Sequence, residues 1–514
     1  MASVRSVFAK KRRREDFPTA VCDPCRRVPS FGSVLKLSLT FCLVGAPFTC
    51  SAQVLSGPIK QRNLVQIENS RTGSPGWSPG LMDASTHVTN APVQGYASEV
   101  SAMPGQIIHL HVSLNPGAAY RIQVYRLGWY GGSGARLIVC LPDCKKSKQG
   151  VERPTPTADP ATGKIDARWP VTDQLRTRRD WVSGYYIAKL IVTSGPRQGK
   201  SNYVPFILRA PARHASPILV QASVNTWEAY NNWGGKSLYA YNSIGNAATK
   251  VSFNRPLGSA AQTPFGWEYQ LVRFLEREGY DVSYTTDVDT DRTPGELLRH
   301  RLVIVSGHDE YWNKGMRDAF ETARSRRVNL TFLGADIGHL QIRYEDSRRT
   351  IVEYRDAQRD PEQRPWLKTV EFEELKPPRP ECTLLGVQNQ GGFRGKYAQP
   401  RSFSVGPAAL GDRWFTGTGF NSSSTLTDLV GYEWDSVKLG CQTPPLTILF
   451  HAAGPPDADA VRHIAPSGAR VFSSGSLQFT WGLDDWGQSR RFADRRLQRF
   501  MKNAVDDLSG SHPK

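Results

Sequence analysis

The 514-residue chain lacks a hydrophobic run long enough to cross a bilayer, and it lacks a concentrated basic stripe despite a formal net charge of +18. An apolar stretch at residues 34–48 falls short of the roughly 20 residues that a transmembrane helix needs. Beyond the first fifty residues the basic excess is spread through the chain, which argues against a nucleic-acid-binding surface. With 39% hydrophobic and 22% charged residues, the composition is that of an ordinary globular protein.

The first fifty-two residues predict a secretory leader. Basic runs at residues 10–14 and 26–27 precede the apolar stretch, and small residues at 50–52 end it. This order is typical of a signal cleaved near Ala52. We therefore expect an exported protein, periplasmic or secreted, that meets a membrane only through residues 1–52. A later start codon and an uncleaved short anchor remain open alternatives.

Few cysteines remain once this leader is removed. Four of the eight lie within residues 1–52, which leaves Cys140, Cys144, Cys382 and Cys441. An even number of cysteines in an exported chain indicates disulfide bonds, and four cysteines allow three pairings. We favour Cys140–Cys144, which closes a small loop, and Cys382–Cys441, which joins two distant segments.

The chain is too long for one hydrophobic core, which suggests more than one domain. An extended polar lead-in rich in Pro and Gly occupies residues 53–90. Runs that alternate with period two then predict an immunoglobulin-like β-sandwich over residues 91–210. Alternating strands and helices over residues 217–510 predict a doubly wound, mostly parallel α/β domain with amidotransferase- or flavodoxin-like layering. The expected fold class is therefore α/β plus all-β.

Individual elements of the second domain can be placed from their patterns. The predicted strands are residues 218–222, 280–284, 301–305 and 328–333, and the predicted helices are residues 267–277, 314–325 and 497–508. Gly279 is well placed to end the first of these helices. Residues 350–470 combine strands with long loops, and we expect an insertion over the sheet.

Polar residues gather where three of these strands end. Residues 225–231, 306–311 and 334–336 each follow a predicted strand. In parallel sheets the chemistry collects at the carboxyl ends of the strands. We therefore expect the three segments to converge and to form the functional site.

Several uncommon motifs occur in a specific order along the chain. They are Tyr-Arg-Leu-Gly-Trp-Tyr-Gly-Gly-Ser-Gly-Ala at 125–135, Thr-Trp-Glu-Ala-Tyr-Asn at 226–231, Gly-Gly-Lys-Ser-Leu-Tyr at 234–239, Gly-His-Asp-Glu-Tyr-Trp at 307–312 and Gly-Ser-Leu-Gln-Phe-Thr-Trp-Gly at 475–482. Together they resemble the N,N-dimethylformamidase large-subunit-like family, from about residue 90 to the C-terminus. The likeness is closer to single-chain, exported relatives than to the two-subunit enzyme.

The resemblance implies a mononuclear iron, Fe3+, held by two tyrosines and one glutamate. The matching residues are Tyr230, Tyr239 and Glu310, with Tyr241 as an alternative to Tyr239. Phenolate and carboxylate oxygens are hard donors that suit ferric iron. A free tyrosine has a pKa of roughly 10, so the metal would have to ionise the phenols. The alternative for Glu310 is a salt bridge to an arginine such as Arg255.

The resemblance also suggests catalytic residues around this ion. His308 matches a histidine beside the metal, and Glu433 is a candidate second acid or base. Where relatives carry an asparagine followed by an aromatic pair, this chain has Asp336 and His339. Asp336 adds negative charge beside the site and is the third catalytic candidate, while His339 adds a new ligand, base or substrate contact.

The predicted function is an iron-dependent hydrolase of a non-peptide C–N (amide) bond, acting on a small linear amide. Trp227, Asn231, Trp312 and His339 are expected to contact this substrate. The alternative is a non-catalytic, exported binding protein that uses the sandwich and a degenerate α/β cleft. Assembly into a homo-oligomer is compatible with either function.

Overall fold

The computed structural model describes residues 62–78, 91–258, 263–392, 401–441 and 444–511. The described residues belong to one compact unit, Gln61–Lys514. The predicted leader lies outside the described residues. Within them, no helix has the length and apolar character that crossing a membrane requires. The predicted domain boundaries remain predictions.

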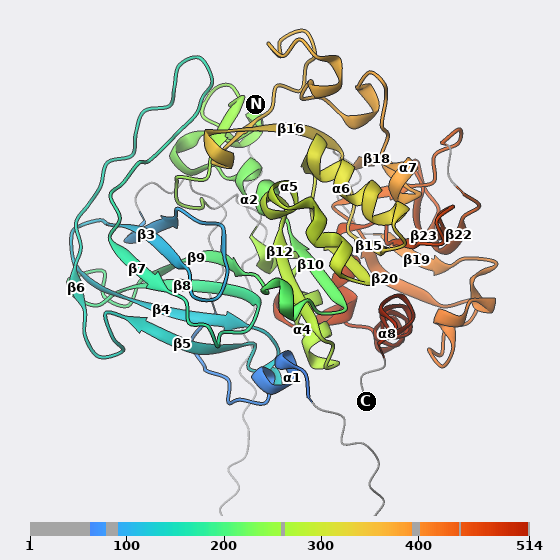
Figure 1. Cartoon of the computed structure of the whole chain (residues 1–514), viewed down its shortest axis with the longest axis horizontal. Helices are drawn as coiled ribbons and strands as arrows, with labels where there is room; N and C mark the ends of the chain where they lie inside the picture. The colour runs from blue at the N-terminus through green and yellow to red at the C-terminus, as the bar shows by residue number, and fades with distance from the viewer. Residues whose placement is uncertain (1–61, 79–90, 259–262, 393–400, 442–443, 512–514) are drawn as a thin grey trace, which may run out of the picture. The chain divides into compact units, whose positions relative to one another are not determined.

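Two sheets built almost entirely from antiparallel pairs form the all-β part of the chain (Figure 1). One sheet has the order β1 (Val93–Ala97), β3 (Ile107–Leu114), β7 (Asp173–Arg176). The other has the order β2 (Ser101–Ala102), β9 (Ser201–Leu208), β8 (Gly184–Val192), β4 (Ala119–Leu127), β5 (Ala135–Leu141), and β6 (Lys148–Gln149) also pairs with β4. Alternate apolar residues of β3 share one buried cluster with those of β4, β8 and β9, so the two sheets enclose a common core.

A nine-stranded sheet forms the centre of the second part (Figure 1). Its order is β12 (Val282–Thr286), β10 (Ile218–Ala222), β13 (Leu302–Ser306), β15 (Asn329–Leu333), β24 (Arg470–Ser473), β23 (Ala458–Ile464), β22 (Thr447–Ala452), β19 (Arg401–Val405), β20 (Thr425–Val430). The four pairings from β12 to β24 are parallel, and the four from β24 to β20 are antiparallel. Among the described residues, parallel pairing therefore covers half of this sheet, and the expectation of a mostly parallel sheet was wrong. One part of the chain thus combines a mixed sheet with helices, and the other consists of β-sheets. This confirms the predicted class of α/β plus all-β.

Helices cover both faces of the parallel strands. Along β13, Leu302 and Ile304 belong to the buried cluster that contains α4 (Tyr269–Arg277) and α8 (Arg495–Ser509). Val303 and Val305 belong to the cluster that contains α6 (Lys314–Ser325). Because side chains alternate across a strand, an unbroken apolar run such as this one requires a partner on each face.

Smaller elements complete the fold. A four-stranded sheet has the order β11 (Lys250–Ser252), β17 (Thr350–Val352), β16 (Leu340–Glu345), β14 (Tyr311–Asn313), and β18 (Gln388–Gly392) pairs with β21 (Glu433–Ser436). The remaining α-helices are α1 (Leu64–Asn69), α2 (Val224–Tyr230), α3 (Pro264–Trp267), α5 (Asp287–Arg292) and α7 (Cys382–Leu385).

Most predicted elements of the second part lie where their patterns placed them. The strand at Ile218–Ala222 and the helix at Lys314–Ser325 have the predicted bounds, and Gly279 follows α4 with φ +78°. Both favoured disulfides, Cys140–Cys144 and Cys382–Cys441, are present.

Two further expectations were wrong. The lead-in is not extended throughout, because it contains α1, whose cap Asn63 donates to the carbonyl of Gly279 at 3.0 Å. Residues 350–470 do not form an insertion over the sheet; four of their strands extend it instead. Short connections can join antiparallel strands at the edge of a sheet, with no helix between them. The sequence of residues 350–470 therefore lacks the alternation of strands and helices that marked the earlier part of the sheet.

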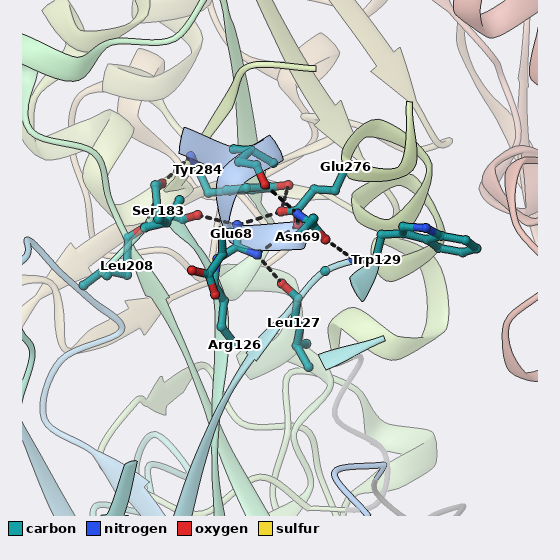
Figure 2. Close-up of polar contacts among 12 residues, drawn as sticks. Glu68, Asn69, Arg126, Leu127, Trp129, Ser183, Leu208, Glu276 and Tyr284 are labelled. Atoms are coloured by element: carbon teal, nitrogen blue, oxygen red, sulfur yellow. Dashed lines mark hydrogen bonds and ion pairs between the residues drawn. The ribbon is translucent and has the colours of Figure 1, made fainter. Parts of the chain in front are cut away.

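A buried ion pair joins the all-β part to helix α4, as Figure 2 shows. Arg126 donates to both carboxylate oxygens of Glu276, at 2.9 and 2.8 Å, and both side chains are fully buried. Asn69 of α1 and the phenol of Tyr284 also donate to Glu276, at 2.7 and 2.9 Å. The backbone N–H of Trp129 in turn donates to Asn69 at 2.8 Å. The residue 125–135 motif therefore has a structural role at this junction.

Candidate functional site

The three polar segments at the strand ends converge as expected. The hydroxyl of Ser223, after β10, donates to the carbonyl of Ser306 at 3.1 Å, and the N–H of Gly307 donates to Leu333 at 2.8 Å. Gly334 allows this closeness, since a Cβ there would lie 1.9 Å from the carbonyl oxygen of Gly307. The fold therefore brings the ends of β10, β13 and β15 together.

Tyr230, Tyr239 and Glu310 meet at this point. The phenol oxygen of Tyr239 lies 2.7 Å from that of Tyr230 and 2.8 Å from Oε2 of Glu310. The phenol oxygen of Tyr230 lies 3.0 Å from the same carboxylate oxygen. Tyr230 ends α2, Tyr239 follows the turn after it, and Glu310 precedes β14. Three oxygen donors from three segments thus lie within 3.0 Å of one another.

The surroundings keep the two phenols neutral. Burial raises the pKa of Tyr230 and of Tyr239 well above the usual value of a phenol, and the negative charge of Glu310 raises both pKa values further. The guanidinium of Arg355 lies 4.1 Å from the ring centre of Tyr239 and partly offsets this effect on its pKa. A larger nearby positive charge would be needed to ionise both phenols at neutral pH.

His308 links this group to a second carboxylate. Its Nε2 lies 3.2 Å from Glu310 and 2.7 Å from Oε2 of Glu433, which begins β21. Burial alone would lower the pKa of His308, but Glu433 and Glu310 outweigh burial and raise this pKa. Burial raises the pKa of Glu433, but the charge of His308 and its contact with that carboxylate lower it overall. The two side chains therefore lie where a proton can pass between Nε2 and Oε2.

Asp336 lies beside the same pair. It occupies the turn after β15 with φ +56°, and its N–H donates to Asp435 at 3.1 Å. Burial raises the pKa of Asp336 well above that of a free carboxyl, and the charge of Glu433 raises it further. His308, Asp336 and Glu433 each offer one ligand atom, and these atoms lie within 4.8 Å of one another.

The structure distinguishes between two alternatives left open by the sequence. Tyr241 is 75% exposed, and its ring centre lies 5.3 Å from that of Tyr239. Of these two tyrosines, Tyr239 is the one that contacts Glu310. Arg255 is buried and pairs at 2.5 Å with Glu228, so the suggested salt bridge from Arg255 to Glu310 is wrong. The sequence could not show whether Arg255 pairs with Glu228 or with Glu310, because both acids follow buried strands.

Two of the expected substrate contacts, Trp227 and Asn231, have buried protein partners. The indole N–H of Trp227 donates to Glu268 at 2.7 Å. Asn231 donates to both carboxylate oxygens of Glu228, at 3.2 and 3.1 Å, and accepts from the N–H of Gly258 at 2.7 Å. Their polar groups therefore shape the turn around α2.

The other two expected contacts, Trp312 and His339, also face protein. Trp312 is fully buried and stacks on Phe320, with ring centres 4.5 Å apart. Nδ1 of His339 lies 2.5 Å from Glu381, and its Nε2 lies 3.5 Å from Glu371. Burial would lower the pKa of His339, but these carboxylates raise it to about 12. His339 is therefore a buried cation paired with acids.

Tyr311 and Arg355 belong to the site although the sequence did not single them out. The phenol oxygen of Tyr311 lies 2.5 Å from that of Tyr239 and accepts a hydrogen bond from Arg355. Arg355 also donates to Glu353 at 2.9 Å. Tyr311 follows Glu310 inside a quoted motif and could have been found there. Arg355 lies in a long loop with no such signal.

A separate hollow lies where the all-β part meets α2. Its lining residues come from both parts of the fold and are Gly95, Tyr96, Ala97, Glu99, Val100, Val204, Pro205, Val224, Trp227, Glu228, Phe253, Arg255 and Leu257. This lining contains none of the three oxygen donors. Trp227 therefore faces this hollow rather than the phenols.

Comparison with known proteins supports the resemblance seen in the motifs. A search of curated proteins finds no match to the chain. The family described as N,N-dimethylformamidase beta subunit-like, C-terminal, matches residues 121–494. This range contains the converging strand ends, both tyrosines, Glu310, Asp336 and Glu433. The chain therefore belongs to the N,N-dimethylformamidase beta subunit-like family.

Proposed function

We propose that this protein is an iron-dependent hydrolase of non-peptide amide bonds, with Tyr230, Tyr239 and Glu310 as the iron ligands. The observation that carries this proposal is the meeting of three buried oxygen donors within 3.0 Å of one another. Family membership supports the reaction class. We also propose that residues 1–52 direct export. In the same proposal the all-β part is an immunoglobulin-like sandwich, and the second part is a doubly wound α/β domain.

The donor set fits ferric iron in its chemistry. Two phenolates and one carboxylate are hard anionic ligands, and their three charges would balance Fe3+. Oxygen ligands that share an ion through bonds of roughly 2.0 Å at right angles lie about 2.8 Å apart, close to the observed spacing. The phenols also need a strong positive charge to ionise, because burial and Glu310 raise their pKa values.

A bound ferric ion would supply Lewis acidity, polarising an amide carbonyl and making a water more acidic. The chain itself supplies the proton carriers. Oε2 of Glu433 can take a proton from a water, and Nε2 of His308, at 2.7 Å, can share it. The same pair can return that proton to the nitrogen of the departing amine. Glu433 begins a strand and is partly exposed, so it can reach a bound substrate.

Iron content and visible absorption test the ligand assignment. The purified protein is expected to contain one iron per chain and to show the purple-to-amber absorption of ferric tyrosinate. Tyr239→Phe should lose the colour and most of the iron. Tyr241→Phe, the same change two residues away, should keep both. A folded, colourless and metal-free parent protein would contradict the proposal.

Hydrolysis of a panel of small linear amides tests the reaction itself. Amine release should depend on iron and should be lost in Glu310→Gln, which should still fold. The hollow between the all-β part and α2 supports the alternative of a non-catalytic binding protein. Tight, iron-independent ligand binding without amine release would favour that alternative.

A further inference from the structure

His308, Asp336 and Glu433 form a second group of potential metal ligands beside the phenols. The group combines one imidazole nitrogen with two carboxylates: His308 follows β13, Asp336 follows β15, and Glu433 begins β21. Side-chain exposure is 1% for His308 and 28% for Glu433, so the group is buried but opens to solvent at Glu433. An ion therefore has a route to it.

Asp336 gives a second, independent observation that points to a ligand in this group. The residue is only 6% exposed, and its Oδ1 has no hydrogen-bond partner among the described atoms. Its carboxyl also contacts that of Glu433. Two buried carboxyls in contact must share either a proton or a cation, because two bare negative charges repel each other.

We propose that His308, Asp336 and Glu433 bind a divalent cation of the zinc type, distinct from the iron assigned to the phenols and Glu310. One imidazole and two carboxylates form a nitrogen–oxygen donor set that suits zinc and leaves a position open for water. Ligand atoms on one zinc ion lie at most about 4.2 Å apart, twice a bond of roughly 2.1 Å. The group, with its atoms within 4.8 Å, would close by less than about 1 Å.

Occupancy of this site would inhibit the reaction. The cation takes the lone pair of Nε2 and a carboxylate oxygen of Glu433, and these are the atoms that carry the proton in the proposed hydrolysis. This consequence rests on the proposed function, whereas the binding of the cation does not. Zinc is therefore expected to bind without displacing iron and to slow amide hydrolysis when present in excess.

Zinc binding to the iron-loaded protein tests the site directly. After equilibrium dialysis against zinc and elemental analysis, the parent should hold one zinc in addition to its iron. Asp336→Asn should bind zinc at least about tenfold more weakly, since it loses a ligand charge while keeping nearly the same shape. Glu371→Gln is the matched control, because this acid lies outside the group and pairs with His339. It should bind zinc as the parent does.

The location of the zinc is checked with a variant of the other site. Tyr239→Phe should lose iron and still bind zinc in an Asp336-dependent way. The proposal is overturned if the parent takes up no zinc, if Asp336→Asn binds zinc like the parent, or if uptake disappears in Tyr239→Phe alone. Zinc binding without any amide hydrolysis would contradict the proposed function and leave this site standing.

Discussion

The phenol oxygen of Tyr239 lies 2.9 and 2.8 Å from the two carboxylate oxygens of Glu310, although 71 positions separate the two residues in the chain. Tyr239 comes from the turn after α2, and Glu310 comes from the segment between β13 and β14. Their contact depends on the parallel pairing of β10 with β13. A ligand shared by these residues would therefore link two separate segments of the fold.

Removing the proposed iron should lower the stability of the protein. A ligand that binds only the folded state stabilises it, by roughly 4 kcal/mol when its concentration is a thousand times its Kd. We expect a chelator to lower the Tm of the parent measured by calorimetry. The Tm of Tyr239→Phe, which should hold little iron, is expected to stay constant. An equal fall in both proteins would mean that the chelator acts elsewhere.

Glu276→Gln should destabilise the protein strongly. It leaves Arg126 as a fully buried charge without its carboxylate partner, and breaking a buried pair in this way costs about 3–5 kcal/mol. Denaturant unfolding should show this loss. Asp180→Asn, which breaks the exposed pair with Arg178, should leave the midpoint unchanged. Similar midpoints for both variants would show that the junction in Figure 2 tolerates the lost charge.

Gly334→Ala should disturb the site and the fold together. Its new Cβ would fall 1.9 Å from the carbonyl oxygen of Gly307, and backbone on both sides must move apart. We expect a lower Tm and reduced iron content, because Glu310 follows Gly307 in the same segment. Gly295→Ala is the control, since a Cβ there meets nothing within 4 Å. Equal iron content in the two variants would contradict this prediction.

Acid should destabilise the protein partly through His463. Burial lowers the pKa of His463 to about 4, and neither ring nitrogen has a hydrogen-bond partner among the described residues. The unfolded-state pKa of a histidine is about 6.5, so above pH 6.5 His463 is neutral in both states and does not lower the stability. The loss grows as the pH falls from there to 4 and reaches roughly 3 kcal/mol below both values.

His463→Phe should therefore lose less stability than the parent between pH 7 and pH 4. Urea unfolding at the two pH values measures the difference. Parallel losses in the two proteins would show that other groups, and not His463, account for acid sensitivity.

The local pattern of the sequence was sufficient for much of the fold. The apolar runs of β10 and β13 and the amphipathic period of α6 marked these elements, because burial on one or two faces leaves a periodic signature. The ordering of strands and helices then predicted that three polar segments would meet at one edge of a sheet. The uncommon motifs indicated the family, and with it Tyr230, Tyr239 and Glu310.

Only the tertiary structure decided which side chains face one another. Tyr239 and Tyr241 are alike in sequence, but one is buried against Glu310 and the other is exposed. Arg355 joined the site from a long loop that carries no periodic signal, and His339 turned to Glu381 instead of the phenols. Side-chain direction depends on backbone turns and distant partners, such as φ +56° at Asp336, and local sequence preferences do not encode those partners.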